Sequence, residues 1–310
     1  MNPPRVAFLG TPEVAVPALQ RLTEQVAVDA VFTNPDQPFG RGRILTPPPV
    51  RTAAEALGRR VHQPSSWKAP ETRTLWESLD IDLAVVVAYG HLLPHWMLDS
   101  CRLGVWNLHY SLLPRWRGAA PVNHALWAGD AETGVSLMRI TPGLDAGPVL
   151  AQVSRPILPS DTAESLLEAL AGDAAALLVR HLPELLAGTA APVPQDETRV
   201  TLAPKLAKAM AGLDPAQPAS ALHRQIRALQ PWPGAELRVG ADTLRVAEVG
   251  GLRALTQRPG SLTWNKAGAW LCAGDGQSLE LLKLQRPGKA VQPALQALQP
   301  WGRQGELLLS

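Results

Sequence analysis

The sequence contains 310 residues, of which 46% are hydrophobic and 18% are charged. These proportions exclude a disordered chain and are typical of a globular protein, and the length suggests about two domains. Lys and Arg number 29 against 27 Asp and Glu, which gives a net charge of +2. This total, taken alone, argues against a protein that binds nucleic acid strongly.

The charge is distributed unevenly along the chain. Residues 1–189 carry 15 Lys and Arg against 18 Asp and Glu, a net charge of −3, while residues 190–310 carry 14 against 9, a net charge of +5. A basic C-terminal part is compatible with a polyanionic partner, and equally with a solvated surface that is basic by chance. Charge alone does not separate these two interpretations.

The cysteines and the apolar runs indicate where the protein resides. Cys101 and Cys272 lie far apart and match no metal-ligand spacing, so we expect two reduced thiols and no metal site. The first residues lack the apolar core of a signal peptide, and the apolar run at 83–89 is too short to span a bilayer. We therefore expect a cytoplasmic protein without membrane association, and a monomer because no apolar oligomerisation element is evident.

Short apolar runs alternate with helical patterns in the N-terminal part. Strands are predicted at residues 5–10, 29–34, 82–89, 104–109, 133–141 and 149–154, and helices at residues 13–24 and 162–186. Strands that alternate with helices indicate βαβ units and a mostly parallel sheet. The run at 82–89 is continuously apolar, which predicts a strand covered on both faces.

The C-terminal part has a different pattern. Residues 187–205 are rich in Pro and Ala with little periodicity, which is typical of a linker. After a predicted helix at 218–229, short β-like runs follow at 236–239, 244–249, 269–273 and 279–284. We therefore divide the chain into an N-terminal α/β domain at residues 1–189, a linker at 190–207 and a smaller β-rich domain at 208–310.

Parallel sheets bind ligands beyond the C-terminal ends of their strands. Four segments occupy such positions in the predicted sheet, namely residues 10–12, 35–49, 88–94 and 107–121. The first of them contains no GxGxxG pattern, so a tight turn explains it better than a dinucleotide site does.

Polar residues are most concentrated at the end of the strand predicted at 104–109 and just after it. Asn107 and His109 are two residues apart, so their side chains leave the same face of the strand, where an amide and an imidazole can stabilise a developing oxyanion and move a proton. Asp145, in a loop flanked by glycines, can orient the ring. On spacing alone, a satisfied polar pair at a strand end and a turn aspartate explain these residues better than an active site does. The sequence contains no GxSxG or HExxH motif, so the nucleophile would belong to the substrate.

These residues stand in a recognisable arrangement. Asn107-x-His109-x-Ser-Leu-Leu-Pro, followed by Gly-Leu-Asp145-x-Gly, resembles the motif set of the folate-dependent formyltransferase superfamily. Longer segments throughout the chain resemble the branch of that superfamily that formylates methionyl initiator tRNA: GTPEVAVPAL (10–19), NPDQPFGRGRILTPPPV (34–50), VVVAYGHLLP (85–94), SLLPRWRGAAPVNHALWAGDAETGVSLM (111–138), APKLAKA (203–209) and IRALQPWPGA (226–235).

The resemblance implies a fold and a reaction. It implies a Rossmann-like N-terminal domain and an OB-like β-barrel as the C-terminal, tRNA-binding domain. It also implies transfer of the formyl group of the cosubstrate 10-formyltetrahydrofolate to the α-amino group of methionyl initiator tRNA, without a metal. The catalytic residues of the family fall on Asn107, His109 and Asp145.

The resemblance further implies two sets of binding residues. Folate contacts fall on Ser111, Leu112, Leu113, Pro114, Ala88, Tyr89, Gly90, Leu92 and Leu144. Contacts to tRNA fall on Arg41 and Arg43 of the insert at 35–49. We add Lys205 and Lys208, which a solvated linker also explains, and Arg115 and Arg117. Arg115 and Arg117 lie beside the catalytic strand, where they can meet either the tRNA acceptor end or acidic side chains.

Two other functions remain open at this point. Another enzyme of the superfamily, acting on a nucleotide or an amino sugar or hydrolysing formyltetrahydrofolate, would keep Asn107, His109 and Asp145. It would not require the basic linker and the β-rich tail. An RNA-binding protein with an inactive enzyme domain is the second alternative, and the presence of all three catalytic residue types argues against it.

Overall fold

A computed structural model of the protein describes residues 3–39, 42–240, 242–254 and 258–309. The chain divides into two compact units. The first comprises Met1–Pro121, Glu132–Pro156 and Leu167–Ala203, and the second comprises Val122–Ala131, Ile157–Leu166 and Pro204–Ser310. The predicted linker at 190–207 contributes its residues up to Ala203 to the first unit and the rest to the second.

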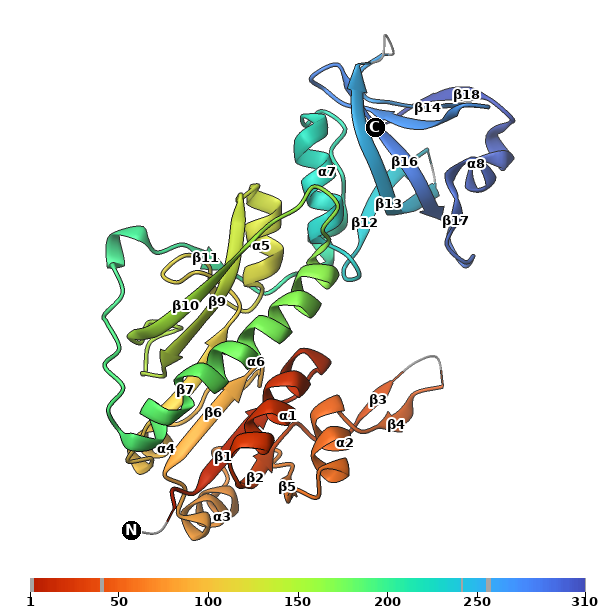
Figure 1. The fold of residues 1–310 in the computed structure, drawn as a ribbon. Helices are drawn as coiled ribbons and strands as arrows, with labels where there is room; N and C mark the ends of the chain where they lie inside the picture. Colours follow the sequence, from red (N-terminus) through yellow and green to blue (C-terminus); the bar gives the residue numbers. More distant parts are fainter. Residues whose placement is uncertain (1–2, 40–41, 241, 255–257, 310) are drawn as a thin grey trace. The chain divides into compact units, whose positions relative to one another are not determined.

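A seven-stranded sheet forms the centre of the first unit (Figure 1). Its strands, in order across the sheet, are β10 (Val149–Pro156), β9 (Glu132–Arg139), β7 (Val105–His109), β6 (Leu83–Val87), β1 (Val6–Gly10), β2 (Val28–Phe32) and β5 (Val61–His62). The four strand pairs β5–β2, β2–β1, β1–β6 and β6–β7 are parallel. At the opposite edge, the pairs β7–β9 and β9–β10 are antiparallel. The predicted α/β class with a mostly parallel sheet is therefore confirmed.

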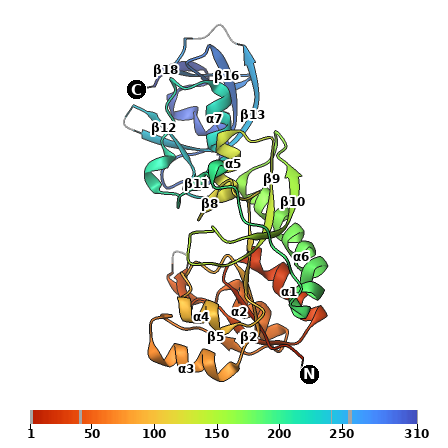
Figure 2. The same cartoon turned by 90° about the vertical axis from the view of Figure 1, so that its left-hand side faces the viewer.

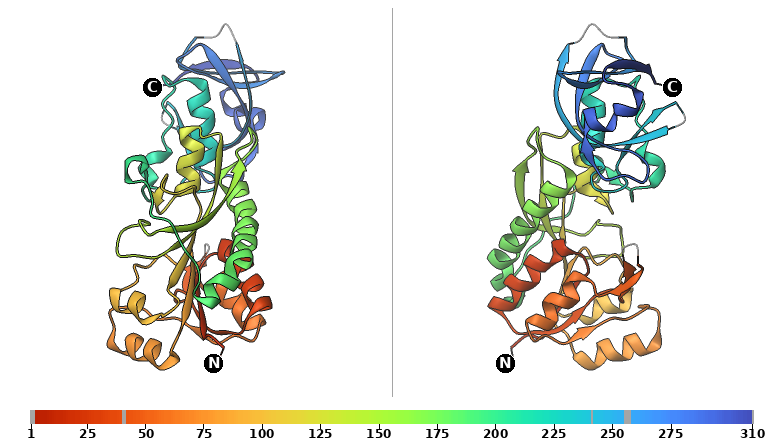
Figure 3. Two further views of the ribbon diagram at one scale, coloured as in Figure 1. Left: turned by 60° about the vertical axis from the view of Figure 1, so that its left-hand side comes forward. Right: turned by 90° about the vertical axis from the view of Figure 1, so that its right-hand side faces the viewer.

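Helices cover both faces of this sheet (Figures 1 and 3). One face carries α1 (Val16–Gln25, after the 3₁₀ turn η1, Glu13–Ala15), α2 (Pro49–Ala56) and the part of α6 (Ala163–Ala187) that belongs to this unit; the other carries α3 (Pro70–Leu79) and α4 (His95–Ser100). Trp67, Trp76 and Met97 pack with Leu9 and Phe32 in the core beneath α3 and α4. All five residues of β6 are buried, as expected for a strand covered on both faces.

Two small β structures extend from the first unit. The insert at 35–49, expected as a loop, contains an antiparallel pair made by β3 (Gln37–Phe39) and β4 (Ile44–Thr46). Within the predicted linker, after the 3₁₀ turn η2 (Glu197–Arg199), β11 (Leu202–Ala203) pairs in parallel with β8 (Arg117–Gly118). The chain near residue 200 is therefore attached to the segment that follows β7.

The second unit is built on a curled antiparallel sheet (Figures 1 and 2). Its strands run in the order β12 (Ala235–Val239), β13 (Asp242–Ala254), β16 (Gln277–Gln285), β15 (Gly268–Cys272), β14 (Ser261–Asn265) and β18 (Gly305–Leu308), and β17 (Gln292–Pro293) pairs with β16. Its helical segments are most of α5 (Pro121–Ala128), η3 (Lys208–Ala211), α7 (Ala219–Ala228), α8 (Ala294–Ala297) and η4 (Gln299–Trp301). The prediction of a smaller β-rich domain of barrel type is confirmed, and β14 and β18 are strands that the sequence analysis missed.

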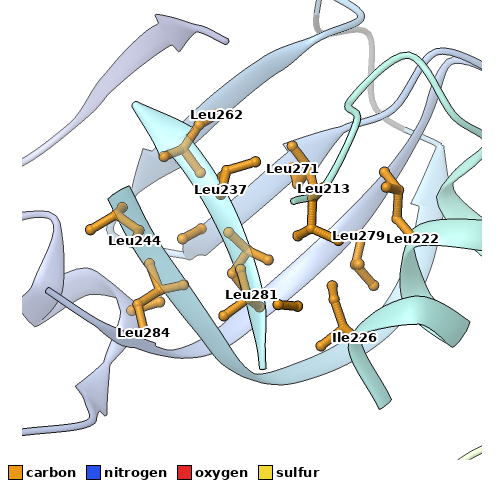
Figure 4. Packing of buried hydrophobic residues seen from close by; sticks show 14 of the residues in the cluster. Leu213, Leu222, Ile226, Leu237, Leu244, Leu262, Leu271, Leu279, Leu281 and Leu284 are labelled. Carbon is orange, nitrogen blue, oxygen red and sulfur yellow. The ribbon is translucent and has the colours of Figure 1, made fainter. Parts of the chain in front are cut away.

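The core of the second unit explains why these short strands fold together. Alternate residues of β12, β13 and β16 point inward, so that Leu237, Leu244 and Leu281 meet Leu222 and Ile226 from α7 (Figure 4). Each of these side chains is at most 2% exposed. A strand pair alone is marginal in water, and the apolar face that α7 covers supplies the missing burial.

The described residues also bear on membrane association. Within residues 3–39, 42–240, 242–254 and 258–309, none of the helices combines the length and the apolar character that a membrane crossing requires.

Candidate active site

The order of the strands indicates where a ligand binds. β2 and β5 extend the sheet from β1 in one direction and β6 and β7 extend it in the other, so the topological switch point lies between β1 and β6. The crevice beyond the C-terminal ends of such strands is the usual binding position in open α/β sheets. Gly10 ends β1 there, and a Cβ atom on it would lie 3.0 Å from the carbonyl oxygen of Val87 in β6.

β7 brings the predicted catalytic residues to this edge. Asn107 pairs with Val86 on one side and Met138 on the other, and His109 pairs with Ser136. Since side chains alternate along a strand, Asn107 and His109 project from the same face. His109 is buried, with 6% of its side chain exposed, and Asn107 is half-buried.

Asp145 reaches His109 from the loop between β9 and β10. Its Oδ2 atom lies 3.6 Å from Nδ1 of His109 and accepts a hydrogen bond of 2.8 Å from the backbone N–H of Gly118. The Nε2 atom of His109 lies 2.9 Å from the carbonyl oxygen of Trp116. Both ring nitrogens therefore face oxygen atoms, and these contacts hold the plane of the imidazole.

The Asp145 loop has an unusual backbone. Asp145 has a φ of 45°, in the left-handed region that non-glycine residues rarely adopt. Two residues later, a Cβ atom on Gly147 would lie 1.8 Å from the carbonyl oxygen of Arg139, so only glycine fits there. The loop thus packs against the end of β9, which directs the Asp145 carboxylate back toward β7.

Two polar side chains, Ser136 and Gln152, form hydrogen bonds to the backbone of the Ser111–Pro114 segment. Ser136 Oγ donates to the carbonyl oxygen of Ser111 at 2.6 Å and accepts from the N–H of Leu113 at 3.1 Å. Gln152 Nε2 donates to the carbonyl oxygen of Leu113 at 2.9 Å. Ser111 is fully buried, and its own Oγ donates to the carbonyl oxygen of Arg115. The segment therefore has a defined backbone shape, and the hydroxyl of Ser111 is used within the protein.

The other predicted folate-binding residues differ in whether their side chains are exposed to solvent or buried. Tyr89 is buried in the core, its hydroxyl accepts from Trp67 Nε1 at 3.0 Å, and burial raises the pKa of Tyr89 to about 12. Ala88 and Gly90 flank it with positive φ angles and are exposed. Leu92 and Leu144 are large apolar side chains that are 89% and 57% exposed. This region therefore offers backbone and leucine side chains, and the Tyr89 ring faces the protein core.

The predicted tRNA-binding cations differ in whether their side chains are exposed or buried. Arg43, in the β3–β4 turn, and Lys205 and Lys208 are exposed, while Arg41 lies outside the described residues. The guanidinium of Arg115 lies 4.3 Å from the centre of the Trp116 ring.

Arg117 is the buried one among these cations, with only 7% of its side chain exposed. For Arg117 the sequence left two partners open, and the structure pairs it with the acidic side chain of Glu197 at 2.8 Å. Its guanidinium is therefore committed to a protein contact.

Several polar residues of the site were missed by the sequence analysis. Ser136 and Gln152 were recognisable as polar residues within strand patterns; the hydrogen bond from Ser136 is buried and the one from Gln152 is partly buried. Asn34 Oδ1 contacts His91 Nε2 at 2.7 Å, an interaction for which the sequence contains no local signal. Among the described residues, no group of three or more His, Cys, Asp or Glu side chains could hold a metal ion.

Comparison with known proteins identifies the family. Residues 4–182 match the formyl transferase family model, and residues 205–300 match the model of the formyl transferase C-terminal domain. The chain belongs to the formyl transferase family. The resemblance drawn from the sequence motifs is therefore confirmed.

Individual relatives agree with this family membership. The chain is 48% identical over 296 residues to the methionyl-tRNA formyltransferase of Halorhodospira halophila, covering 94% of each chain. Its fold is similar to that of an N-formyltransferase from Helicobacter canadensis in complex with folinic acid and dTDP-3-aminofucose, with a TM-score of 0.69, 16% identity, and coverage of 91% of this chain and 99% of that one. It also spans about half of HypX from Aquifex aeolicus in complex with tetrahydrofolic acid, with a TM-score of 0.66, 18% identity, and coverage of 96% of this chain and 47% of that one.

Proposed function

We propose that this formyl transferase transfers the formyl group of 10-formyltetrahydrofolate to the α-amino group of methionyl initiator tRNA, and that it does so in the cytoplasm as a monomer. One observation carries the proposal: the 48% identity to a methionyl-tRNA formyltransferase extends through both the catalytic part and the C-terminal part of the chain. The N-formyltransferase crystallised with an amino-sugar nucleotide is only 16% identical. The RNA acceptor is therefore favoured over a sugar acceptor.

The contacts of the site suggest how its residues act. The cosubstrate supplies the formyl group, whose carbon is attacked by the methionyl amine, and the bond to N10 of the folate then breaks. The Asn107 amide and the His109 ring donate hydrogen bonds to the formyl oxygen as negative charge develops on it. His109 Nε2 lies 2.9 Å from the Trp116 carbonyl oxygen, so the ring has to release this contact before Nε2 donates to the formyl oxygen. Asp145 orients His109 and accepts the proton that the amine loses, which passes to the folate N10.

The residues around the strand ends are suited to a folate ring and tail. The hydrogen-bonded backbone of Ser111–Pro114 presents a fixed surface, and Leu92 and Leu144 provide exposed apolar contact area. Ala88 and Gly90 leave the backbone next to them accessible. We assign the folate to these residues, with Tyr89 contributing through its backbone because its ring is buried.

The cations suggest how the RNA is held. Arg41, Arg43, Lys205 and Lys208 supply charge for the phosphates, and the net charge of +5 over residues 190–310 adds to it. Arg117 is left out of this assignment because its guanidinium is paired with Glu197. Arg115 stays in it as a neighbour of the catalytic strand.

A single assay with several acceptors tests the proposal. The full-length protein is given 10-formyltetrahydrofolate together with methionyl initiator tRNA, with a dTDP-linked amino sugar, or with no acceptor. We expect N-formylmethionine to be recovered from the tRNA and neither other reaction to approach that rate. Faster formylation of the sugar, or hydrolysis without an acceptor, would show another enzyme of the superfamily. Binding of tRNA without any turnover would show an RNA-binding protein with an inactive enzyme domain.

A further inference from the structure

Gln195, from the segment between α6 and η2, connects the Asp145 loop to Arg117. Its Nε2 group donates to the carbonyl oxygens of Asp145 and Gly147, each at 2.7 Å. Its Oε1 atom accepts from Nε and Nη2 of Arg117, at 3.0 and 2.9 Å. Both donors and the acceptor of the amide are thus used, and all four residues belong to the first unit.

Arg117 determines which way this amide points. A guanidinium has only donors, so the oxygen of Gln195 must face Arg117 and its NH₂ group must face the two carbonyls. Arg117 is itself fixed, because Glu197 accepts from Nη1 and Nη2 at 3.1 and 2.8 Å. A flipped amide would place donors against donors, which makes the observed orientation the stable one.

The two carbonyls that Gln195 binds belong to Asp145 itself and to Gly147, two residues later. Asp145 has a positive φ of 45°, a conformation that persists only where surrounding contacts support it. On the far side of the turn, the Asp145 carboxylate faces Gly118 N–H and His109 Nδ1. Gln195 therefore acts on the backbone of the residue whose side chain meets the catalytic imidazole.

We propose that Gln195, oriented by Arg117, is a positioning residue that holds the Asp145 loop so that the carboxylate faces His109. It does not touch the reacting atoms. The catalytic consequence rests on the function proposed above, whereas the conformational consequence for the Asp145 loop does not depend on it.

Gln195→Glu tests the proposal most directly. A glutamate keeps an oxygen acceptor for Arg117 but loses both N–H donors and turns an oxygen toward the two carbonyls. We expect kcat for formyl transfer to fall by about 10- to 100-fold, because small misplacements of catalytic groups have effects of this size. The KM values for folate and tRNA should stay within about two-fold, since the amide atoms of Gln195 are all bonded within the protein. Gln20→Glu, the same substitution at an exposed position of α1, is the matched control and should behave as the unsubstituted protein.

A double-mutant cycle separates positioning from general structural support. In an Asp145→Asn background, a residue that acts through Asp145 should add less than about a two-fold further loss in kcat. The full loss repeated in that background, or an undiminished kcat in Gln195→Glu alone, overturns the proposal. Gln195→Ala, which removes the donors without adding a charge, replaces Gln195→Glu in the cycle if the latter unfolds at the assay temperature.

An NMR measurement tests the loop independently of activity. The Gly118 amide is bonded to the Asp145 carboxylate, so its hydrogen exchange should accelerate in Gln195→Glu while amides in β1 and β6 keep their protection. Unchanged exchange at Gly118 contradicts the proposal. If the unsubstituted protein formylates no tRNA, the proposed function fails, and the Gly118 exchange still decides whether Gln195 positions the loop.

Discussion

The proposed catalytic site at the end of β7 and the proposed RNA-binding cations are built in opposite ways. Around His109 and Asp145, side chains and backbone are tied by hydrogen bonds to Trp116, Gly118 and Gln195. In contrast, Arg43 lies between the strands of a short hairpin, Lys205 lies in an irregular segment and Lys208 begins the 3₁₀ turn η3, and all three are exposed. Stabilising one oxyanion requires donors at fixed positions, whereas neutralising phosphates requires charge and reach. Substitutions should therefore have distinct consequences in the two regions.

The largest effect is expected at the catalytic strand. Asn107→Ala removes one oxyanion donor and should reduce kcat by about 100-fold or more, which is typical for loss of such a donor. Single-turnover formylation of methionyl initiator tRNA measures this, and the melting temperature should be unchanged. Near-normal turnover would remove Asn107 from the proposed mechanism.

A smaller effect, on stability, is expected beneath the Ser111–Pro114 segment. Ser136→Ala leaves the Leu113 N–H and the Ser111 carbonyl without their buried partner, which should lower the free energy of unfolding by about 1–3 kcal/mol. Urea unfolding measures the loss, and the KM for folate should rise as the segment relaxes. Ser78→Ala on the exposed face of α3 is the matched control, with a change within about 0.5 kcal/mol. Equal stability losses in the two variants would show that the Ser136 contacts are unimportant.

Substitutions in the insert at 35–49 should change the KM for tRNA and leave the KM for folate unaffected. The double substitution Arg41→Ala and Arg43→Ala removes two charges and should raise the KM for tRNA by roughly ten-fold, with the KM for folate unaffected. Steady-state kinetics with each substrate varied in turn separates the two. Arg73→Ala, at another exposed arginine, serves as the control. A parallel rise in both KM values would place the insert in the folate site as well.

The smallest effect is expected at the lysines near residue 205. Lys205→Ala and Lys208→Ala should each reduce the slope of log affinity against log salt concentration by about 1, as for the loss of one phosphate contact. Filter binding of tRNA across a salt series provides the slope. Lys68→Ala, at an exposed lysine of the first unit, should leave it unchanged. An unaltered slope in both lysine variants would show that these side chains face solvent and do not contact phosphates.

Local patterns predicted much of the fold. The alternation of apolar runs located β1, β2, β6, β7, β9 and β10 to within a few residues, since burial on a sheet is recorded in the sequence itself. The same approach missed β18, which pairs with the distant strand β14, and it missed β14 itself, although β14 forms a local hairpin with β15. It also treated residues 35–49 as a loop, where β3 and β4 pair.

The sequence supplied the candidate catalytic residues, whereas most of the contacts that hold them were not predicted. Asn107 and His109 were placed together by strand periodicity alone. That Asp145 lies next to His109 depends on a loop conformation which Gly147 permits and Gln195 holds. Arg117 was considered for RNA or an acidic side chain, and only the fold assigns it to Glu197.

By itself, the sequence determined the class of fold, the family and the residues proposed to carry the chemistry, because these depend on spacing along one strand and on recognisable motifs. Only the tertiary structure decided which polar side chains hold that chemistry in place. Arg117 and Gln195 are separated by 78 residues, and their contact arises because β11 pairs with β8. Hydrogen bonds between distant segments leave no periodic trace, so they become visible only when the chain is folded.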